Sequence, residues 1–294
     1  MSQESCTHGG MSRRNFLHAA CGCAAAAAAF GEAFAHAGPI RIAQAAGGAA
    51  PSGRVRITFL GHSAFRIETP GGKTIYIDPW LSNPKAPANA KQVDRADLIL
   101  VTHGHADHVG ETVEIAKKTN ARLLTIAELA TYFGTQGVPV ANIVRMNKGG
   151  TAVAIPGTPI KVTMIRADHS SSVTYTDPQT KVVSLTPGGE AVGYIIYLEN
   201  GLRILHAGDT AIYSDMRFFG ERYKPEIAML PIGDHFTMGP EDAVEAAKMF
   251  GVKAAFPMHY GTFPVLTGTI FEFGKMLPAA IRMHAPAPGD TVEF

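Results

Sequence analysis

Three histidines and one aspartate fall within six consecutive positions, directly after an apolar segment that is typical of a buried strand. The segment spans 97–102, and the four polar residues are His103, His105, Asp107 and His108. A strand that is apolar along its length is covered on both faces, which favours a layered α/β fold. The histidine spacings of two and three differ from the i, i+4 spacing that puts two ligands on one helical face. We therefore predict a loop at a strand end whose side chains surround bound metal, because an ordinary polar loop does not explain this density of ligand-type residues.

Further candidate ligands follow three later segments that also have the pattern of strands. They are His169, Asp209 and His259. Catalytic groups of α/β proteins gather in loops at strand ends. All three cysteines lie in the first 23 residues, so a site built from these loops has only histidine and carboxylate ligands. Such nitrogen and oxygen ligands suit zinc, manganese or iron.

From Arg54 onward, predicted strands and helices alternate in a pattern that favours one mixed α/β domain. Helices are predicted at 111–119 and 240–250, the second because Pro240 and two acidic residues mark a helix start. The predicted strands are 55–60, 64–68, 73–78, 97–102, 122–126, 160–166, 193–198, 203–207, 226–231 and 253–258.

The order of the ligand motifs resembles the metallo-β-lactamase fold superfamily, in which a His-x-His-x-Asp-His loop precedes a lone histidine, a lone aspartate and a final histidine. The resemblance extends over residues 54–294. Leu-Gly-His-Ser-Ala-Phe at 60–65, Ile-Asp-Pro-Trp at 77–80 and Gly-Asp-His-Phe-Thr-Met-Gly-Pro at 233–240 are similar to one branch. That branch contains metal-dependent hydrolases related to L-ascorbate-6-phosphate lactonases. The resemblance implies an α/β fold, a four-layer αββα sandwich with metal ions at one edge.

The resemblance also implies how the ligands divide between two ions. The first ion would be held by His103, His105 and His169, the second by Asp107, His108 and His259, and Asp209 would bridge them. Two divalent ions about 3.5–4 Å apart can share a water and lower its pKa, which gives a hydroxide that attacks a carbonyl or a phosphorus. Asp107 would also orient this hydroxide. We expect zinc, with manganese or iron as the alternatives.

Other polar residues beside these motifs have alternative roles. Asp78 either supports the metal loop or begins a turn, and His62 either contacts the ligands or is a structural histidine. His235 is a candidate for substrate contact or proton donation, against a structural role at the entry to the next helix. Tyr260 could aid an oxyanion or form part of the wall of the site. The long segment at 173–190 is predicted to set specificity as a loop over the cleft.

The N-terminal segment is predicted to be an export signal. The pair Arg13 and Arg14 precedes an alanine-rich stretch and a small-x-small cleavage motif at 35–37, an arrangement that resembles a twin-arginine signal. The alanine-rich stretch is too short and too weakly apolar for a stable membrane span. We expect the mature protein to be periplasmic or secreted. The predicted organisation is a signal peptide at 1–37, a flexible linker at 38–53 and a hydrolase domain at 54–294.

Charge limits the classes of partner. With 26 basic and 25 acidic residues the formal charge is +1, which disfavours nucleic acid and leaves a small-molecule substrate. The leading hypothesis is an exported binuclear hydrolase that uses a metal-bridging hydroxide on a small ester, lactone, amide or phosphoester. The alternatives are an iron-dependent oxidoreductase or dioxygenase of the same fold and a non-catalytic metal-binding protein. The sequence does not predict an oligomeric state.

Overall fold

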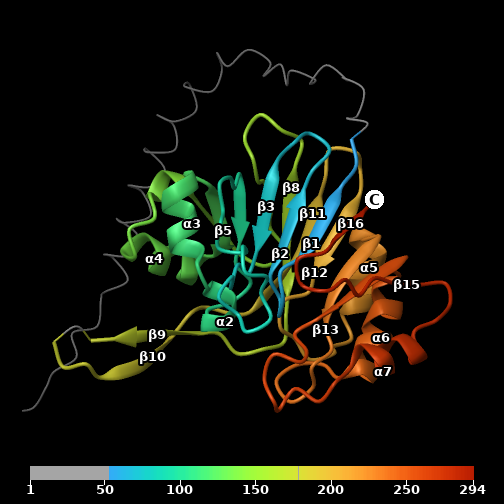
Figure 1. The fold of residues 1–294 in the computed structure, drawn as a ribbon. Coiled ribbons are helices and arrows are strands. Elements are labelled where there is room, and N and C mark those ends of the chain that lie inside the picture. Colours follow the sequence, from blue (N-terminus) through green and yellow to red (C-terminus); the bar gives the residue numbers. More distant parts are fainter. Residues whose placement is uncertain (1–52, 178) are drawn as a thin grey trace, which may run out of the picture. The chain divides into compact units, whose positions relative to one another are not determined.

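Two β-sheets face each other and carry helices on their outer sides (Figure 1). The computed structural model describes residues 53–177 and 179–294. Within these residues, the first sheet consists of β1 (Arg56–Phe59), β2 (Phe65–Glu68), β3 (Thr74–Ile77), β4 (Leu98–Leu100), β5 (Arg122–Ile126), β6 (Ile143–Met146) and β16 (Thr291–Glu293). Their order is β16-β1-β2-β3-β4-β5-β6, with β3 to β6 parallel.

The second sheet has a similar plan. In the described part of the chain it consists of β7 (Thr151–Val153), β8 (Lys161–Arg166), β11 (Val192–Tyr197), β12 (Arg203–His206), β13 (Ile227–Pro231), β14 (Ala254–Met258) and β15 (Arg282–Met283). Their order is β15-β14-β13-β12-β11-β8-β7, with β12 to β15 parallel. The carboxyl ends of parallel strands meet at one edge of a sheet, where loops can bring functional groups together.

Helices cover the outer face of each sheet, as expected for a four-layer αββα sandwich. In the part of the chain that the structure describes, the helices are α2 (Ala106–Val109), α3 (Thr112–Thr119), α4 (Ala127–Thr135), η1 (Val140–Asn142), α5 (Met216–Tyr223), α6 (Pro240–Phe250) and α7 (Ile270–Met276). Helices α3 and α4 lie on the first sheet, while α5, α6 and α7 lie on the second (Figure 1). The structure therefore confirms the predicted fold class.

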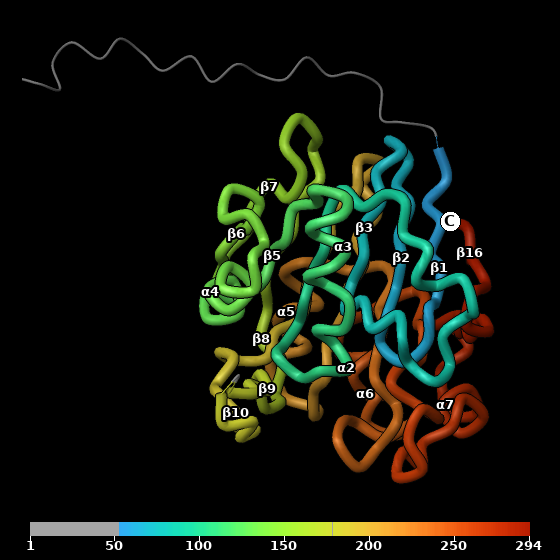
Figure 2. The backbone as a smooth tube through the Cα atoms, turned by 60° about the vertical axis from the view of Figure 1, so that its left-hand side comes forward, coloured from blue at the N-terminus to red at the C-terminus, as the bar shows by residue number. Residues whose placement is uncertain are grey.

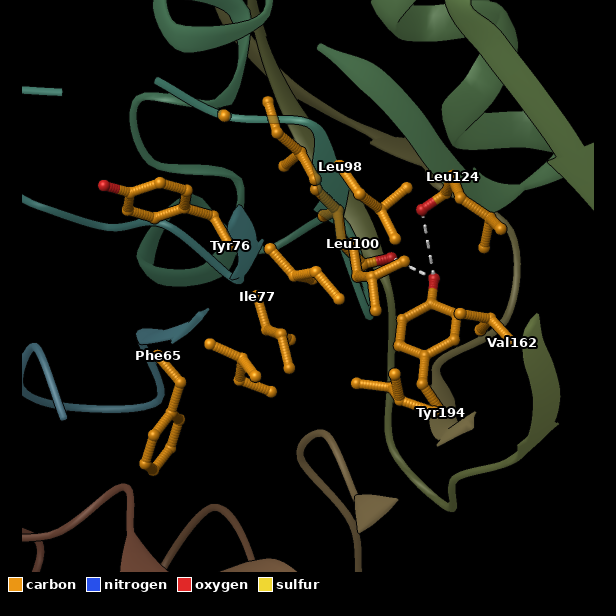
Figure 3. Close-up of a cluster of buried hydrophobic side chains, with 14 of the residues drawn as sticks. Phe65, Tyr76, Ile77, Leu98, Leu100, Leu124, Val162 and Tyr194 are labelled. Atoms are coloured by element: carbon orange, nitrogen blue, oxygen red, sulfur yellow. Dashed lines mark hydrogen bonds between the residues drawn. The ribbon is translucent and has the colours of Figure 1, made fainter. Parts of the chain in front are cut away.

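Apolar side chains from both sheets form the core between them (Figure 3). Tyr194 of β11 is fully buried and points toward the first sheet, where its hydroxyl donates a hydrogen bond of 2.6 Å to the carbonyl oxygen of Val101. Val101 immediately follows β4 and precedes the predicted metal loop. The hydroxyl of Thr125 donates a second hydrogen bond of 2.9 Å to the same carbonyl. A hydrogen bond of this kind contributes about 0.5–1.5 kcal/mol, so Tyr194 and Thr125 together stabilise the chain where β4 ends and the loop begins.

Each strand and helix predicted from the sequence is present, with bounds that differ by at most two residues. The largest difference is at β4, which ends at Leu100 although the apolar pattern continues to 102. There the backbone N–H and the hydroxyl of Thr102 donate hydrogen bonds to Asp78 instead of to a strand of the first sheet, while its carbonyl accepts one from Val192 of β11 in the second sheet.

The predicted signal peptide at 1–37 and the predicted linker at 38–53, except for its last residue, lie outside the described residues. Among the described helices, none has the length and apolar character needed to cross a membrane.

The segment at 173–190 contains most of a two-stranded hairpin, formed by β9 (Ser172–Thr176) and β10 (Val183–Pro187). The hairpin lies at the same end of the sheets as α2 (Figure 1, Figure 2). At its base the hydroxyl oxygen of Ser171 accepts a hydrogen bond of 3.1 Å from the backbone N–H of Gly104. The hairpin is thus attached to the predicted metal loop, and its role in specificity stays a prediction.

Candidate metal centre

All seven predicted metal ligands lie at one edge of the sandwich, beyond strand ends. His103 follows β4, and His105 is the N-cap of α2, a single helical turn that contains Asp107 and His108. His169 follows β8, Asp209 follows β12 and His259 follows β14. The first four ligands therefore come from the first sheet and the last three from the second.

The side chains form two neighbouring groups, and a third set of His103, His108 and Asp209 joins them. In one group, the nearest ligand atoms of His103, His105 and His169 lie within 4.8 Å of one another. In the other, Asp107, His108 and His259 do so together with His62. The structure thus brings together the same two sets of three that the resemblance implies and adds His62 to the second. Their roles as ligands stay a prediction.

Asp209 lies between the two groups. Its Oδ2 atom is 3.2 Å from Nε2 of His108 and 2.9 Å from Nε2 of His259, both in the second group. The same oxygen is 3.8 Å from Nε2 of His169 in the first group. The Asp209 side chain is 2% exposed, so one buried carboxylate faces donors from both groups.

The residues present fit divalent metal ions. Among the described residues, buried polar atoms without a hydrogen-bond partner include Oδ1 of Asp209 and Nδ1 of His259. Unpaired buried polar atoms are unfavourable by about 1–3 kcal/mol each, and coordination of a cation would satisfy them. The donor set of imidazole nitrogens and carboxylate oxygens matches the preferences of zinc, manganese and iron.

Burial keeps most of the histidines in the form that binds metal. It lowers the pKa of His103 well below its usual value, and it also lowers the pKa of His105 and of His169. A neutral imidazole nitrogen is the ligand form of histidine. These side chains are therefore prepared to coordinate a cation at neutral pH.

His108 and Asp209 stabilise each other as charged groups. Burial would lower the pKa of His108, but the negative charges of Asp209 and Asp78 outweigh burial and raise it well above the usual value. Burial would raise the pKa of Asp209, but the charges of His108 and His259 hold it well below the usual value. A buried pair of this kind contains a proton that a bound metal cation would displace.

Asp78 supports the metal loop, which is one of its two predicted roles. Its side chain is fully buried and accepts hydrogen bonds from the backbone N–H of Thr102 at 2.8 Å and from the Thr102 hydroxyl at 2.7 Å. Its Oδ2 atom is also 2.8 Å from Nδ1 of His108. A carboxylate on one imidazole nitrogen orients the other nitrogen toward a metal. Asp78 therefore directs Nε2 of His108 toward Asp209.

His62 contacts a predicted ligand directly. Its Nε2 atom lies 3.1 Å from Oδ2 of Asp107, and its Nδ1 atom lies 3.0 Å from the hydroxyl oxygen of Thr262. Burial lowers the pKa of His62 to about 4, so the ring is neutral and carries one proton. Burial would raise the pKa of Asp107, but the hydrogen bond from His62 and the charge of His108 lower it below its usual value. His62 thus holds Asp107 as an oriented carboxylate.

Three residues of the centre have left-handed backbone conformations that are uncommon outside glycine. They are His62 with φ 55°, Asp78 with φ 45° and His259 with φ 55°. Such conformations cost about 1–3 kcal/mol and persist where the surrounding structure imposes them, frequently at functional sites. The backbone strain at this edge is consistent with a site that fixes its side chains in place.

The two further catalytic candidates lie outside the ligand groups. His235 follows β13, and its exposed ring contacts the ring of Phe236 with centroids 4.4 Å apart. Tyr260 follows His259, and its ring stacks on Phe59 with centroids 6.4 Å apart. Burial raises the pKa of Tyr260, so its hydroxyl stays protonated. Catalytic roles for both residues stay predictions.

A pocket beside Asp107 contains residues that the sequence did not single out as functional. Its volume is about 600 Å³, and it is lined by Trp80, Ala106, Asp107, Phe236, Phe263, Pro264 and Val265. A signal was present in the sequence, because Phe-Pro-Val at 263–265 is an apolar run in a loop that follows a ligand. Neither His235 nor the β9–β10 hairpin contributes to this lining.

Comparison with known sequences agrees with the ligand pattern. Residues 73–260 match the model of the β-lactamase superfamily domain. A UPF0173 metal-dependent hydrolase of Rubrobacter xylanophilus is 45% identical over 242 residues, which cover 81% of this chain and 96% of the relative. A UPF0173 metal-dependent hydrolase of Koribacter versatilis is 45% identical over 238 residues, with 81% and 97% covered.

Solved structures have the same architecture. A metallo hydrolase from the archaeon Ignicoccus hospitalis superimposes with a TM-score of 0.70 at 34% identity, covering 82% of this chain and 98% of that one. An isothiocyanate hydrolase from Delia radicum gut bacteria superimposes with a TM-score of 0.61 at 22% identity, covering 81% and 98%. At that identity the second similarity shows the fold alone.

Proposed function

The chain belongs to the β-lactamase superfamily and, within it, to the metal-dependent hydrolases, and on this premise we propose that it uses two divalent ions to hydrolyse a small ester, lactone, amide or phosphoester. The first ion would be held by the group of His103, His105 and His169. The second would be held by Asp107, His108 and His259, and Asp209 would contact both.

One observation carries the two-ion proposal: the position of Asp209. A site for a single ion needs one cluster of ligands, whereas here a buried carboxylate faces donors from two clusters, at 2.9 Å from Nε2 of His259 and 3.8 Å from Nε2 of His169. A carboxylate in this position would contact both ions. It also brings negative charge to a place where two cations would otherwise repel each other.

Bound divalent ions would supply a water of lowered pKa and would stabilise negative charge on the substrate. Asp107 lines the pocket in which the substrate would lie. Its lowered pKa keeps it ionised at neutral pH, so it can accept a hydrogen bond from the attacking water and orient it. His62 donates from Nε2 to Oδ2 of Asp107 and thereby fixes the direction of that carboxylate.

Metal analysis combined with a substrate panel tests this proposal. We expect about two zinc or manganese ions per purified chain. Chelation should reduce hydrolysis at least about a hundredfold, because the ions supply several kcal/mol of charge stabilisation. Restoration of zinc or manganese should return activity. Asp107→Ala is the inactive control and should hydrolyse none of the esters, lactones, amides and phosphoesters of the panel. One iron per chain, or full activity after complete metal removal, would contradict the proposal.

We also propose that the protein is exported in the folded state. The paired Arg13 and Arg14 and the cleavage motif at 35–37 support export. The alignment with the Rubrobacter xylanophilus protein covers 96% of that protein but 81% of this chain. The unmatched part is about as long as the predicted signal and linker together.

A reporter fusion tests export. Residues 1–53 fused to a reporter that folds in the cytoplasm should carry it to the periplasm of cells with a twin-arginine pathway. The double substitution Arg13→Lys and Arg14→Lys should abolish this transfer, because the receptor reads the arginine pair. The measurement is the reporter activity of the periplasmic fraction, with Arg41→Lys as the matched control. Equal periplasmic activity of the double variant would contradict twin-arginine export.

A further inference from the structure

The pocket beside Asp107 has walls that are almost entirely apolar. Trp80, Phe236, Phe263, Pro264 and Val265 line it together with Ala106. Asp107 is the one charged residue among the described residues that line the pocket. A substrate whose reacting bond lies at Asp107 would therefore place its adjoining group against apolar surface.

Two of these apolar side chains are exposed to solvent. Phe236 is 51% exposed and Val265 is 43% exposed. They belong to different loops, after β13 and β14 respectively, yet they line the same pocket. Clustered exposed apolar side chains around a concave surface commonly mark a binding site.

The aromatic part of the wall contacts the centre. Trp80 and Phe263 stack with ring centroids 5.9 Å apart and an angle of 25°. The ring of His62 forms T-shaped contacts with both rings, with centroids 5.2 Å from Trp80 and 5.5 Å from Phe263. Since His62 also holds Asp107, the aromatic wall and the carboxylate form one packed unit.

The composition of the walls argues against an anionic group in the pocket. Phosphate and carboxylate groups are generally bound by arginine, lysine or the backbone N–H groups of a helix start. The lining contains no lysine or arginine among the described residues, so no side chain of these walls is suited to bind an anion. A volume of about 600 Å³ is within the range of pockets for small organic ligands.

We propose that the substrate carries an uncharged apolar group, aromatic or branched aliphatic, that binds between the Trp80–Phe263 stack and the Phe236–Val265 rim. This inference rests on the proposed hydrolytic function and specifies its substrate class as hydrophobic esters, lactones or amides. Sugar phosphates, whose groups next to the reacting bond are polar or anionic, are then poor substrates.

Trp80 offers a direct test of binding, because it is the single tryptophan of the chain. We expect cyclohexanol, an uncharged probe that cannot be hydrolysed, to change the fluorescence of the metal-loaded protein in a saturable manner. Inorganic phosphate and glycerol should have no such effect. Phe263→Ala and, at a more exposed position, Phe236→Ser should each weaken the apparent affinity for cyclohexanol at least about fivefold, since each removes apolar area that the bound probe would cover. Phe271→Ala is the matched control, because Phe271 is 75% exposed and is not among the pocket residues.

Turnover gives the second readout. Across a series of 4-nitrophenyl esters from acetate to hexanoate, kcat/KM should rise about fourfold for each added methylene. The increase in kcat/KM for each methylene should be smaller in the Phe236→Ser variant and unchanged in the Phe271→Ala control.

The outcomes separate the two proposals. Absence of a cyclohexanol response, an equal response in Phe236→Ser, or a preference for phosphorylated substrates would overturn the apolar-group proposal and leave hydrolysis intact. A cyclohexanol response that Phe236→Ser weakens, with no turnover of any compound in the panel, would support the pocket and contradict the hydrolytic function.

Discussion

Asp209→Asn is expected to reduce turnover at least about a thousandfold and to lower the metal content from about two ions per chain to fewer than one. The substitution keeps the shape of the side chain but removes the negative charge that faces donors of both groups, at 3.2 Å from His108 and 3.8 Å from His169. A thousandfold loss corresponds to about 4 kcal/mol in the barrier, the scale at which bound ions stabilise developing charge. The measurements are kcat/KM and elemental analysis of the same preparation.

Two further variants make this result specific. Asp94→Asn is the matched control, because the Asp94 side chain is 95% exposed, and it should retain both metal and activity. Asp107→Ala should lose turnover while keeping the ion of the His103 group, so its metal content should be close to one. An Asp209→Asn protein with two ions and at least a tenth of the normal activity would show that Asp209 bridges nothing.

Gly110→Ala is expected to destabilise the folded protein by about 3–5 kcal/mol, because backbone strain and overpacking add at this position. Gly110 follows α2 with φ 40° and ψ −130°, a conformation that side chains rarely adopt. A Cβ atom there would lie 2.4 Å from Cα of Trp80 and 2.5 Å from the carbonyl oxygen of Pro79. Both are backbone atoms, so no side-chain rotation can relieve the contact. The free energy of unfolding, measured by denaturant titration, checks this expectation.

Gly157→Ala is the matched control for the Gly110 variant. Gly157 has φ 75°, and a Cβ atom there would meet nothing within 4 Å. A positive φ alone costs about 1–2 kcal/mol, so the difference between the two variants measures the additional cost of the Gly110 backbone conformation and of the collision with the chain at Trp80. Equal destabilisation by both substitutions would contradict this expectation, since it would mean that the backbone at Trp80 shifts with no loss of free energy of unfolding.

Much of the ligand geometry could be expected from the sequence because strand ends fix where side chains fall. His169, Asp209 and His259 each follow an apolar strand, and the parallel order of β12 to β14 places the last two at one edge. The spacing of His103 and His105 was sufficient to predict a loop, although the structure places Asp107 and His108 in the single helical turn α2. One turn is too short to have a periodicity that a sequence pattern reveals.

The partner of Asp107 and the pocket could not be predicted in the same way. The contact between His62 and Asp107 joins residues 45 positions apart. It also depends on a left-handed backbone conformation of His62, which a histidine in the sequence does not predict. Trp80, Phe236 and Phe263 come from three separate loops, and the packing of those loops determines that they share a pocket. Loop packing of this kind depends on the whole tertiary structure and leaves no periodic signal.

The division of the ligands between the two sheets has a consequence beyond chemistry. His103 and His105 extend from the first sheet and His169 from the second, and the other group is divided in the same way. Each bound ion would thus cross-link the halves of the sandwich, and binding would add to the free energy of unfolding by about 4 kcal/mol when the free ion exceeds its dissociation constant a thousandfold. The supply of metal in a cell would then determine the lifetime of the folded protein as well as its activity. Protein that folds without metal would unfold more often and would be degraded first by proteases.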